Sequence, residues 1–266
     1  MIIDINGARV NYEIMGEGKP VILLHGWGAC INAMAPIWMF LKNKYKVYVL
    51  DFPGESGESS VPPTAWGVPE YGEMVKKFID ELEIDKPSVI AHSFGGRVTI
   101  YLASKYKDLF DKIILTDAAG VKPKTTIKKE IKKLLFKCGK VMLKLFTPGD
   151  KLDEKMKAYR DKYSSPDYKA LKTEVMRETF KKVISLDLSS NLKEITRPTL
   201  LVWGENDLDT PLYMAKKMES EIKDSGLVVL KNAGHFSYID NSNEYNVIID
   251  NFLGGKYNPD NTSCLN

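Results

Sequence analysis

The hydrophobic period of the chain changes abruptly within residues 87–104, and this change restricts the possible folds more than any other feature. Residues 89–91 (Val-Ile-Ala) form a short apolar run typical of a buried strand, whereas the apolar side chains within residues 98–102 fit a helix packed against a sheet. The change of period falls at Ser93. The sequence therefore predicts a strand that turns sharply into a helix at this serine.

Small residues surround the predicted turn. Ala91, Gly95 and Gly96 flank it, as is needed where a strand and a helix meet so closely. The turn would present the Ser93 hydroxyl at a helix N-terminus, where unpaired N–H groups and the helix dipole favour negative charge. That position suits a nucleophile that generates an oxyanion. An ordinary N-cap serine would give the same local pattern, so the assignment depends on partners elsewhere in the chain.

Strands and helices alternate along most of the chain. The Asn6-Gly7 turn predicts a hairpin over residues 2–14. Further strands are predicted at 20–24, 47–50, 112–115, 198–203 and 227–230, and helices at 33–41, 68–82, 212–222 and 243–253. This order predicts an α/β fold, with a mostly parallel central sheet covered by helices on both faces.

Residues 121–190 interrupt the alternation with a segment that reads as helical and contains no convincing strand. From residue 121 to residue 188 there are 17 Lys and 2 Arg against 9 Asp or Glu, an excess of 10 positive charges. Because the whole chain has a net charge of +3, the residues outside this segment carry a net charge of −7. We expect an inserted helical cap whose surface differs from the rest. The predicted units are a core of residues 1–120 and 191–254, the cap at 121–190 and a flexible tail at 255–266.

A serine hydroxyl is a weak nucleophile until a positioned base removes its proton, and the chain has three histidines. His92 shares the tight turn with Ser93, so its ring should point away from the hydroxyl, and His25 belongs to a glycine-rich turn. We interpret both as structural. His235 lies on a loop after the last predicted strand and is free to approach Ser93 from outside.

The acid that would orient His235 is expected after the strand at 198–203. Asp207 and Asp209 both follow that strand, and the chemistry of the turn alone would explain either of them. Asp117, which follows an earlier strand, is the candidate if neither serves.

With these residues in place, the sequence resembles the α/β-hydrolase fold family, in the branch that carries a helical cap. Residues 25–28 (His-Gly-Trp-Gly) resemble its oxyanion loop, residues 91–95 (Ala-His-Ser-Phe-Gly) its nucleophile elbow, and the segments around Asp207 and His235 its acid and base. Alanine replaces the first glycine of the usual elbow. The resemblance covers residues 20–253, and the chain order Ser, Asp, His is the one expected for this fold.

The resemblance implies a catalytic triad of Ser93, His235 and Asp207 that uses no metal or other cofactor. It places Asp207 rather than Asp209 in the acid's role. It also implies that the backbone N–H groups of Trp27 and Phe94 stabilise the oxyanion, each such donor being worth about 10²–10³ in rate.

The leading functional hypothesis is a serine hydrolase that cleaves a small or medium carboxylic ester, thioester or lactone through an acyl-enzyme. The same fold carries carbon–carbon bond hydrolases of ring-cleavage products and cofactor-free haloperoxidases or perhydrolases. The carbon–carbon hydrolases usually have a small polar residue before the serine and Trp after the base, where this chain has His92 and Phe236, which favours esters. A ligand receptor with a slow triad is the alternative outside the enzymes.

Apolar residues recur at steps of three and four between residues 127 and 145 of the cap. Part of this stripe could face the serine, so Leu135 and Met142 are predicted to contact the substrate. Phe236, which directly follows His235, is a third predicted substrate contact. The lysines among them form either a solvated back or a surface that draws in anionic substrates. A basic helix of this kind also admits a third interpretation, a protein at a membrane surface.

The N-terminus lacks the pattern of a signal peptide, and no window approaches about 18 uninterrupted apolar residues. Cys30, Cys138 and Cys264 lie far apart and outside any metal-ligand spacing, which fits free thiols in a reducing compartment. We expect a cytoplasmic protein that binds a small-molecule substrate, without nucleic acid and without stable membrane insertion. The sequence leaves its oligomeric state open.

Overall fold

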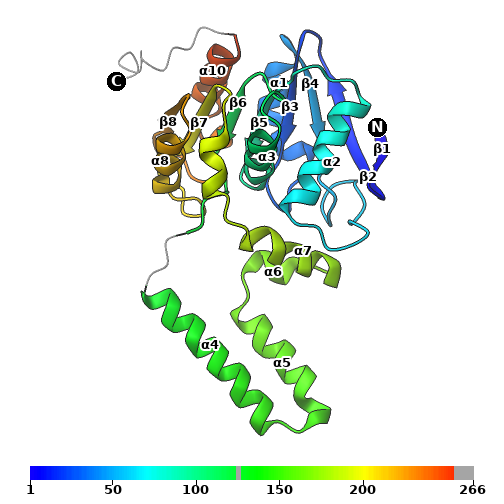
Figure 1. Cartoon of the computed structure of the whole chain (residues 1–266), viewed down its shortest axis with the longest axis vertical. Coiled ribbons are helices and arrows are strands. Elements are labelled where there is room, and N and C mark those ends of the chain that lie inside the picture. The colour runs from blue at the N-terminus through cyan, green and yellow to red at the C-terminus, as the bar shows by residue number, and fades with distance from the viewer. Residues whose placement is uncertain (124–126, 255–266) are drawn as a thin grey trace.

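A computed structural model of the chain describes residues 1–123 and 127–254 (Figure 1). Eight strands form one sheet in the order β1-β2-β4-β3-β5-β6-β7-β8. β2 runs antiparallel to β1 and to β4, and every other pairing is parallel, which confirms the predicted mostly parallel sheet. The strands are β1 (Ile2–Ile5), β2 (Ala8–Met15), β3 (Lys19–Leu24), β4 (Tyr45–Leu50), β5 (Ser88–His92), β6 (Ile113–Thr116), β7 (Thr199–Gly204) and β8 (Ser225–Leu230).

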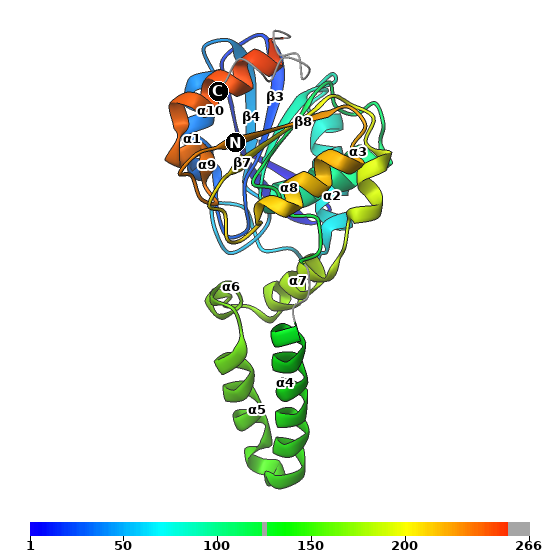
Figure 2. The same ribbon diagram turned by 90° about the vertical axis from the view of Figure 1, so that its left-hand side faces the viewer.

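Helices cover both faces of the sheet, as predicted (Figure 2). β5 shows why both faces need a cover: Val89 belongs to one apolar core, Ile90 to the other, and all five residues of the strand are buried. One core is closed by α1 (Ala35–Leu41), α9 (Ser237–Asp240) and α10 (Ser242–Leu253), and the other by α2 (Val68–Glu81), α3 (Phe94–Lys105) and α8 (Leu212–Glu221).

Two local features follow from single residues. Asn6 and Gly7 have φ of 54° and 79° between β1 and β2, the left-handed conformation that the predicted two-residue hairpin turn requires. The helix predicted at 33–41 is divided into a 3-10 turn, η1 (Ile31–Met34), and α1. Pro36 accounts for the division, because a residue without an N–H is best placed in the first turn of an α-helix.

The described residues between β6 and β7 form four α-helices, followed by the 3-10 helix η2 (Ser189–Glu194). α6 and α7 lie beside the sheet and its helices, whereas α4 and α5 form a hairpin that projects away from them (Figures 1 and 2). The four helices are α4 (Ile127–Phe146), α5 (Gly149–Tyr163), α6 (Pro166–Ala170) and α7 (Glu174–Ser185). The predicted tail at 255–266, with Cys264, lies outside the described residues.

α7 is attached to the sheet domain at both of its ends. Glu55 accepts hydrogen bonds from the backbone N–H groups of Lys172 (2.7 Å) and Thr173 (2.6 Å), just before the helix. After the helix, the Leu186 carbonyl accepts a hydrogen bond of 2.9 Å from Arg97 Nη1. Within the described ranges, no helix is long and apolar enough to cross a membrane.

Candidate active site

The turn between β5 and α3 places Ser93 directly after the carboxyl end of β5, an inner strand of the sheet. Ser93 has φ of 48° and ψ of −108°, a left-handed conformation that is strained for any residue other than glycine and that is common where function requires it. A Cβ on Gly95 would lie 2.4 Å from the Leu24 carbonyl oxygen, and one on Gly96 would lie 2.4 Å from the Ala118 Cβ. The small residues after Ser93 are therefore required by the close approach of α3 to β3 and to the loop after β6.

Ser93, His235 and Asp207 form a continuous chain of hydrogen bonds. Ser93 Oγ lies 3.0 Å from His235 Nε2, and His235 Nδ1 lies 2.9 Å from Asp207 Oδ2. Because a carboxylate accepts, the His235 proton resides on Nδ1, which leaves Nε2 free to take the proton of the serine. The structure thus brings together the three residues that the sequence proposed as nucleophile, base and acid.

Of the two candidate acids, Asp207 hydrogen-bonds to His235 and Asp209 does not. Asp207 is 3% exposed; its Oδ1 accepts hydrogen bonds from the N–H groups of Asp209 (2.8 Å) and Thr210 (2.9 Å), and its Oδ2 accepts one from Thr210 Oγ1 (2.6 Å). Burial alone would raise the pKa of the Asp207 carboxyl, but the hydrogen bonds from His235 and Thr210 outweigh it and hold this pKa below its ordinary value. Asp207 therefore stays ionised beside His235.

The same pair of residues sets the protonation of the base. Burial lowers the pKa of the His235 imidazole, but the hydrogen bond to Asp207 and the charge of that carboxylate more than compensate, so the His235 pKa lies above its ordinary value of 6.5. The charges of Asp117 and Asp209 act in the same direction.

Activity should therefore rise with pH through an apparent pKa above 6.5, because only neutral His235 can accept the Ser93 proton. On the acidic side kcat/KM should fall about tenfold per pH unit. The measurement is kcat/KM for a neutral substrate from about pH 5 to about pH 9. A flat profile, with the chemical step shown to limit the rate, would rule out His235 as the base.

Asp117 joins the loops that carry the acid and the base. It follows β6 with φ of 45°, and its carboxylate accepts hydrogen bonds from Gly204 N (2.8 Å), Ser237 N (3.1 Å) and Ser237 Oγ (2.6 Å). Gly204 is the last residue of β7, three positions before Asp207, and Ser237 is two positions after His235. Asp117 is therefore a positioning residue for both loops and does not hydrogen-bond to His235.

Replacing Asp117 with Asn should lower the free energy of unfolding by about 1–3 kcal/mol, the cost of leaving a buried polar group unpaired. In either orientation the amide nitrogen of Asn would face one of the backbone N–H groups of Gly204 or Ser237. Urea unfolding measures the loss, with Asp85→Asn at an exposed position as the control. An unchanged midpoint would show that the loops do not depend on this carboxylate.

The pH dependence of stability provides a second measurement on this residue. Burial raises the pKa of Asp117 from 3.8 to about 7, although its three hydrogen bonds oppose the rise. The folded protein then holds this proton more tightly than the unfolded chain, so the free energy of unfolding should fall as pH rises from 3.8 to about 7. The Asn variant should lack that part of the fall.

The family resemblance predicts that the backbone N–H groups of Trp27 and Phe94 lie around an oxyanion. Within the described residues, neither of these N–H groups donates a hydrogen bond to the protein. Both residues line the cavity that contains Ser93. Gly26 lies directly against that site, because a Cβ there would be 2.9 Å from His92 Nδ1 and 3.3 Å from Ser93 Cβ. The absence of a side chain at Gly26 thus lets the turn that carries Trp27 approach Ser93 closely.

The other two histidines have structural contacts, as the sequence indicated. Burial lowers the pKa of His92 to about 3, so its ring is neutral, and its Nε2–H donates a hydrogen bond of 2.8 Å to the His235 carbonyl. Burial likewise lowers the pKa of His25, whose Nδ1–H donates to the Gly26 carbonyl (2.7 Å) while its Nε2 accepts from Phe52 N (2.9 Å). His92 thus positions the backbone of His235, and His25 positions the turn that carries Gly26.

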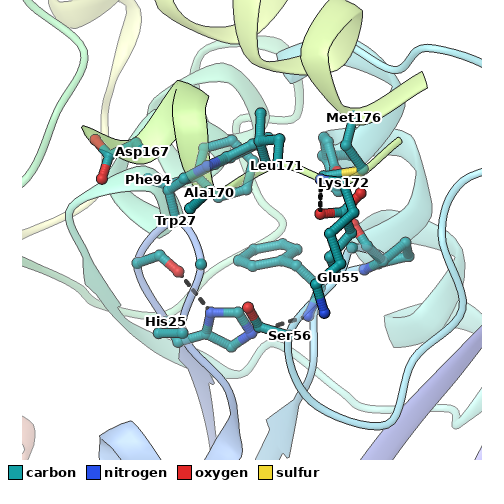
Figure 3. A pocket seen from close by; sticks show the side chains of 17 residues that line it. His25, Trp27, Glu55, Ser56, Phe94, Asp167, Ala170, Leu171, Lys172 and Met176 are labelled. Atoms are coloured by element: carbon teal, nitrogen blue, oxygen red, sulfur yellow. Dashed lines mark hydrogen bonds between the residues drawn. The ribbon is translucent and has the colours of Figure 1, made fainter. Parts of the chain in front are cut away.

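Two cavities meet at Trp27 and Phe94. The first has a volume of about 370 Å³ and runs beneath α6 and α7, between the loop that carries Glu55 and the side chains of Leu171 and Met176 (Figure 3). The second has a volume of about 520 Å³ and contains the reactive groups. Its lining includes Ser93, His235, Phe236, Arg97, Phe180 and Ile184.

Of the three residues predicted to contact the substrate, one lines a cavity and two do not. Phe236 lines the second cavity and is 46% exposed. Leu135 and Met142 line neither cavity; they lie on α4 and are 64% and 55% exposed. On the side of the insertion, the apolar wall of the cavity that contains Ser93 comes from α7 instead, through Phe180, Val183 and Ile184. The α4–α5 hairpin points away from the sheet (Figure 2). The acyl pocket expected from Leu135 and Met142 is therefore not formed by these residues.

A cation could be held by one cluster among the described residues. Ligand atoms of Asp207, Asp209 and His235 lie within 4.8 Å of one another. However, both oxygens of Asp207 and Nδ1 of His235 already take part in the hydrogen bonds described above, so a metal would have to break the Asp207–His235 pair. We assign these atoms to the hydrogen-bonded triad.

Sequence reasoning missed three residues of the site. Thr210 holds both oxygens of Asp207, and Glu55 attaches the insertion beside the first cavity. Arg97 is 9% exposed and lines the second cavity. Its position one helical turn after Ser93 on α3 was a usable signal, because residues four apart lie on the same helix face.

Comparison with known proteins gives a consistent result. Residues 19–242 match the profile of the family described as alpha/beta hydrolase fold. The 2-hydroxy-6-oxononadienedioate/2-hydroxy-6-oxononatrienedioate hydrolase of Comamonas testosteroni is 27% identical over 266 residues, which cover 94% of this chain and 92% of that protein.

Solved structures also match along almost the whole chain. The meta-cleavage product hydrolase of Pseudomonas fluorescens IP01 has a TM-score of 0.72 at 22% identity, over 97% of this chain and 98% of that one. A bromoperoxidase from Bacillus anthracis has a TM-score of 0.75 at 23% identity, over 96% of this chain and 99% of that one. At these sequence identities the two structures are evidence for the fold alone.

Proposed function

The chain belongs to the α/β hydrolase fold family, and on that premise we propose that it is a serine hydrolase that cleaves a small or medium ester, thioester or lactone through an acyl-enzyme. One observation carries the proposal: the chain of hydrogen bonds from Ser93 through His235 to Asp207, 3.0 Å and 2.9 Å long, at a cavity lined by two residues with free backbone N–H groups. A nucleophile, a base in the correct tautomer, an ionised acid and oxyanion donors are the groups that acyl transfer requires.

Acylation begins when Ser93 Oγ attacks the carbonyl carbon and its proton moves to His235 Nε2. The imidazolium that forms is stabilised by Asp207, and the N–H groups of Trp27 and Phe94 donate to the tetrahedral oxyanion. The carbon–oxygen or carbon–sulfur bond to the leaving group then breaks, and His235 gives it the proton. Water completes the cycle: His235 removes its proton, the resulting hydroxide attacks the acyl carbon, and the acid product leaves as Ser93 regains its proton.

Cleavage of a carbon–carbon bond is the second candidate, and two observations favour it. The curated relative described above is named for hydrolysis of 2-hydroxy-6-oxo dicarboxylic acids. The second cavity also contains Arg97, a buried cation that has no carboxylate within ion-pair distance among the described residues and could bind an acidic substrate. Asp167 and Asp209 line the same cavity, so a substrate carboxylate would have to lie close to Arg97.

A substrate panel separates the two candidates. The purified protein is assayed with chromogenic esters of rising acyl length, with matched thioesters and lactones, and with a 2-hydroxy-6-oxo dienoic acid. The proposal expects the highest kcat/KM on one of the oxygen or sulfur esters. A preference of about 10² or more for the dienoic acid would assign the second function, and turnover of every compound at the rate of buffer would leave the protein a binder without hydrolase activity.

A further inference from the structure

α4 has two distinct apolar faces, and the first of them packs against α5. The Phe136 and Tyr159 rings stack with centroids 5.3 Å apart, and Phe136 meets Tyr163 edge-on at 5.5 Å. Gly139 allows this approach, because a Cβ there would collide with the Tyr159 ring. These contacts join the two helices of the hairpin.

The second face of α4 is uncovered. Large apolar side chains recur along it at steps of three and four, and more than half of the surface of each is exposed. Single exposed apolar residues are normal on a protein surface, but a continuous row of them marks a site of interaction. We name this set the outer stripe; it consists of Ile131 (52% exposed), Leu134 (61%), Leu135 (64%), Val141 (56%), Met142 (55%), Leu145 (70%) and Phe146 (74%).

The protein's own core does not cover the outer stripe. The hairpin extends away from the sheet, and its far end, where α4 passes into α5, is the most distant part of the insertion (Figures 1 and 2). The space above the two cavities is already occupied by α6 and α7, through Leu171, Met176, Phe180 and Ile184. The most exposed members of the stripe, Leu145 and Phe146, lie at that far end.

Charge selects among the possible partners of the stripe. α4 contains seven lysines and one glutamate, and Lys137 and Lys144 on it are exposed. Two copies of α4 packed against each other would bring together two helices that each carry six more positive than negative charges (seven lysines less one glutamate), which opposes a symmetric dimer through this face. A surface that is both apolar and anionic complements the stripe and the lysines at once.

We propose that the α4–α5 hairpin binds the surface of an anionic lipid bilayer, with α4 lying in the plane of the interface and the outer stripe buried among the acyl chains. An amphipathic helix with a basic polar side and a Leu- and Phe-rich apolar side is the known physical form of such a contact. The rest of the protein remains above the membrane, with α6 and α7 joining the hairpin to the active-site cavities. This proposal is independent of the reaction catalysed.

The test measures binding of the full chain to vesicles by flotation, with phosphatidylcholine alone and with phosphatidylcholine containing about one-third phosphatidylglycerol. Binding is expected to the anionic vesicles, at least tenfold weaker to the neutral ones, and falling with added salt because surface charges are screened. Ser93→Ala should bind like the wild type, which separates this result from the outcome of any activity assay.

Matched variants locate the contact. Leu135→Gln with Met142→Gln should reduce binding at least tenfold, whereas Met39→Gln with Val247→Gln, at equally exposed apolar positions of the core, should not. Lys137→Gln with Lys144→Gln should weaken binding to anionic vesicles, and the control with the same change of net charge is Lys216→Gln with Lys223→Gln on the core.

Cys138 provides a direct reporter, because it is exposed on α4. With Cys30 and Cys264 replaced by Ser, an environment-sensitive dye on Cys138 should shift to the blue on addition of anionic vesicles. Three results would overturn the proposal: equal binding of the stripe variants and the wild type, a dimer in solution that the Leu135→Gln and Met142→Gln pair dissociates, or a Cys138 thiol that is protected from labelling without lipid.

Discussion

Replacing Ser93 with alanine should lower kcat by about 10⁶ and abolish covalent labelling by a fluorophosphonate probe. The reason is geometric: Ser93 Oγ lies 3.0 Å from the unprotonated nitrogen of His235, at the N-terminus of α3. Without the oxygen there is no acceptor for the acyl group, and His235 has no proton to remove. The remaining activity should reflect the oxyanion donors and substrate binding alone, a residual about 10³–10⁴ above water.

Labelling and turnover are compared with those of Ser56→Ala, which changes another serine that lines a cavity beside Trp27. That variant should be labelled like the wild type, and thermal unfolding should show both variants folded. A Ser93→Ala protein that still reacts with the probe would mean that a different side chain is the nucleophile.

The elbow and the sheet could be predicted because they rest on local properties. A change of hydrophobic period at Ser93, with glycines directly after it, specifies a strand-turn-helix, and the structure gives the physical reason in the 2.4 Å approach that a Cβ on Gly95 would make to Leu24. Alternating apolar runs specify a sheet covered on both faces in the same way. The choice of His235 as the base could be made by elimination, because His25 and His92 lie in turns that fix the positions of their rings.

The residues that hold the site together could not be predicted, because their contacts join distant parts of the chain. Glu55 meets Lys172 across 117 positions, and Arg97 meets Leu186 across 89. The role of Asp117 depends on β7 pairing with β6, which brings Gly204 next to it. Sequence spacing contains no information on such pairings when only one sequence is considered.

The helix at residues 127–146 shows a different limit of prediction from sequence. Periodicity correctly indicates an apolar face, but it does not say what covers that face. Leu135 and Met142 were assigned to the substrate on the assumption that the helix packs over the nucleophile. Its direction is set by the connections at its ends and by the aromatic contacts of Phe136 with α5, which turn the outer stripe toward solvent.

The turn chemistry alone fits both Asp207 and Asp209, the family resemblance favours Asp207, and their asparagine variants are expected to differ greatly. Asp207→Asn should lower turnover by about 10⁴, because an amide NH₂ facing His235 Nδ1 favours the tautomer that places the proton on Nε2, where it blocks acceptance of the Ser93 proton. Asp209→Asn should change turnover only severalfold, because its side chain makes no hydrogen bond to His235 among the contacts described.

A pH profile distinguishes this mechanism from simple damage to the loop. The Asp207 carboxylate is what raises the pKa of His235 against the effect of burial, so the acidic limb of the residual activity in Asp207→Asn should move to lower pH than in the wild type. Asp209→Asn should move it far less. Equal losses with unshifted limbs would mean that Asp207 only supports the turn through Thr210, and a larger loss for Asp209→Asn would reverse the two roles.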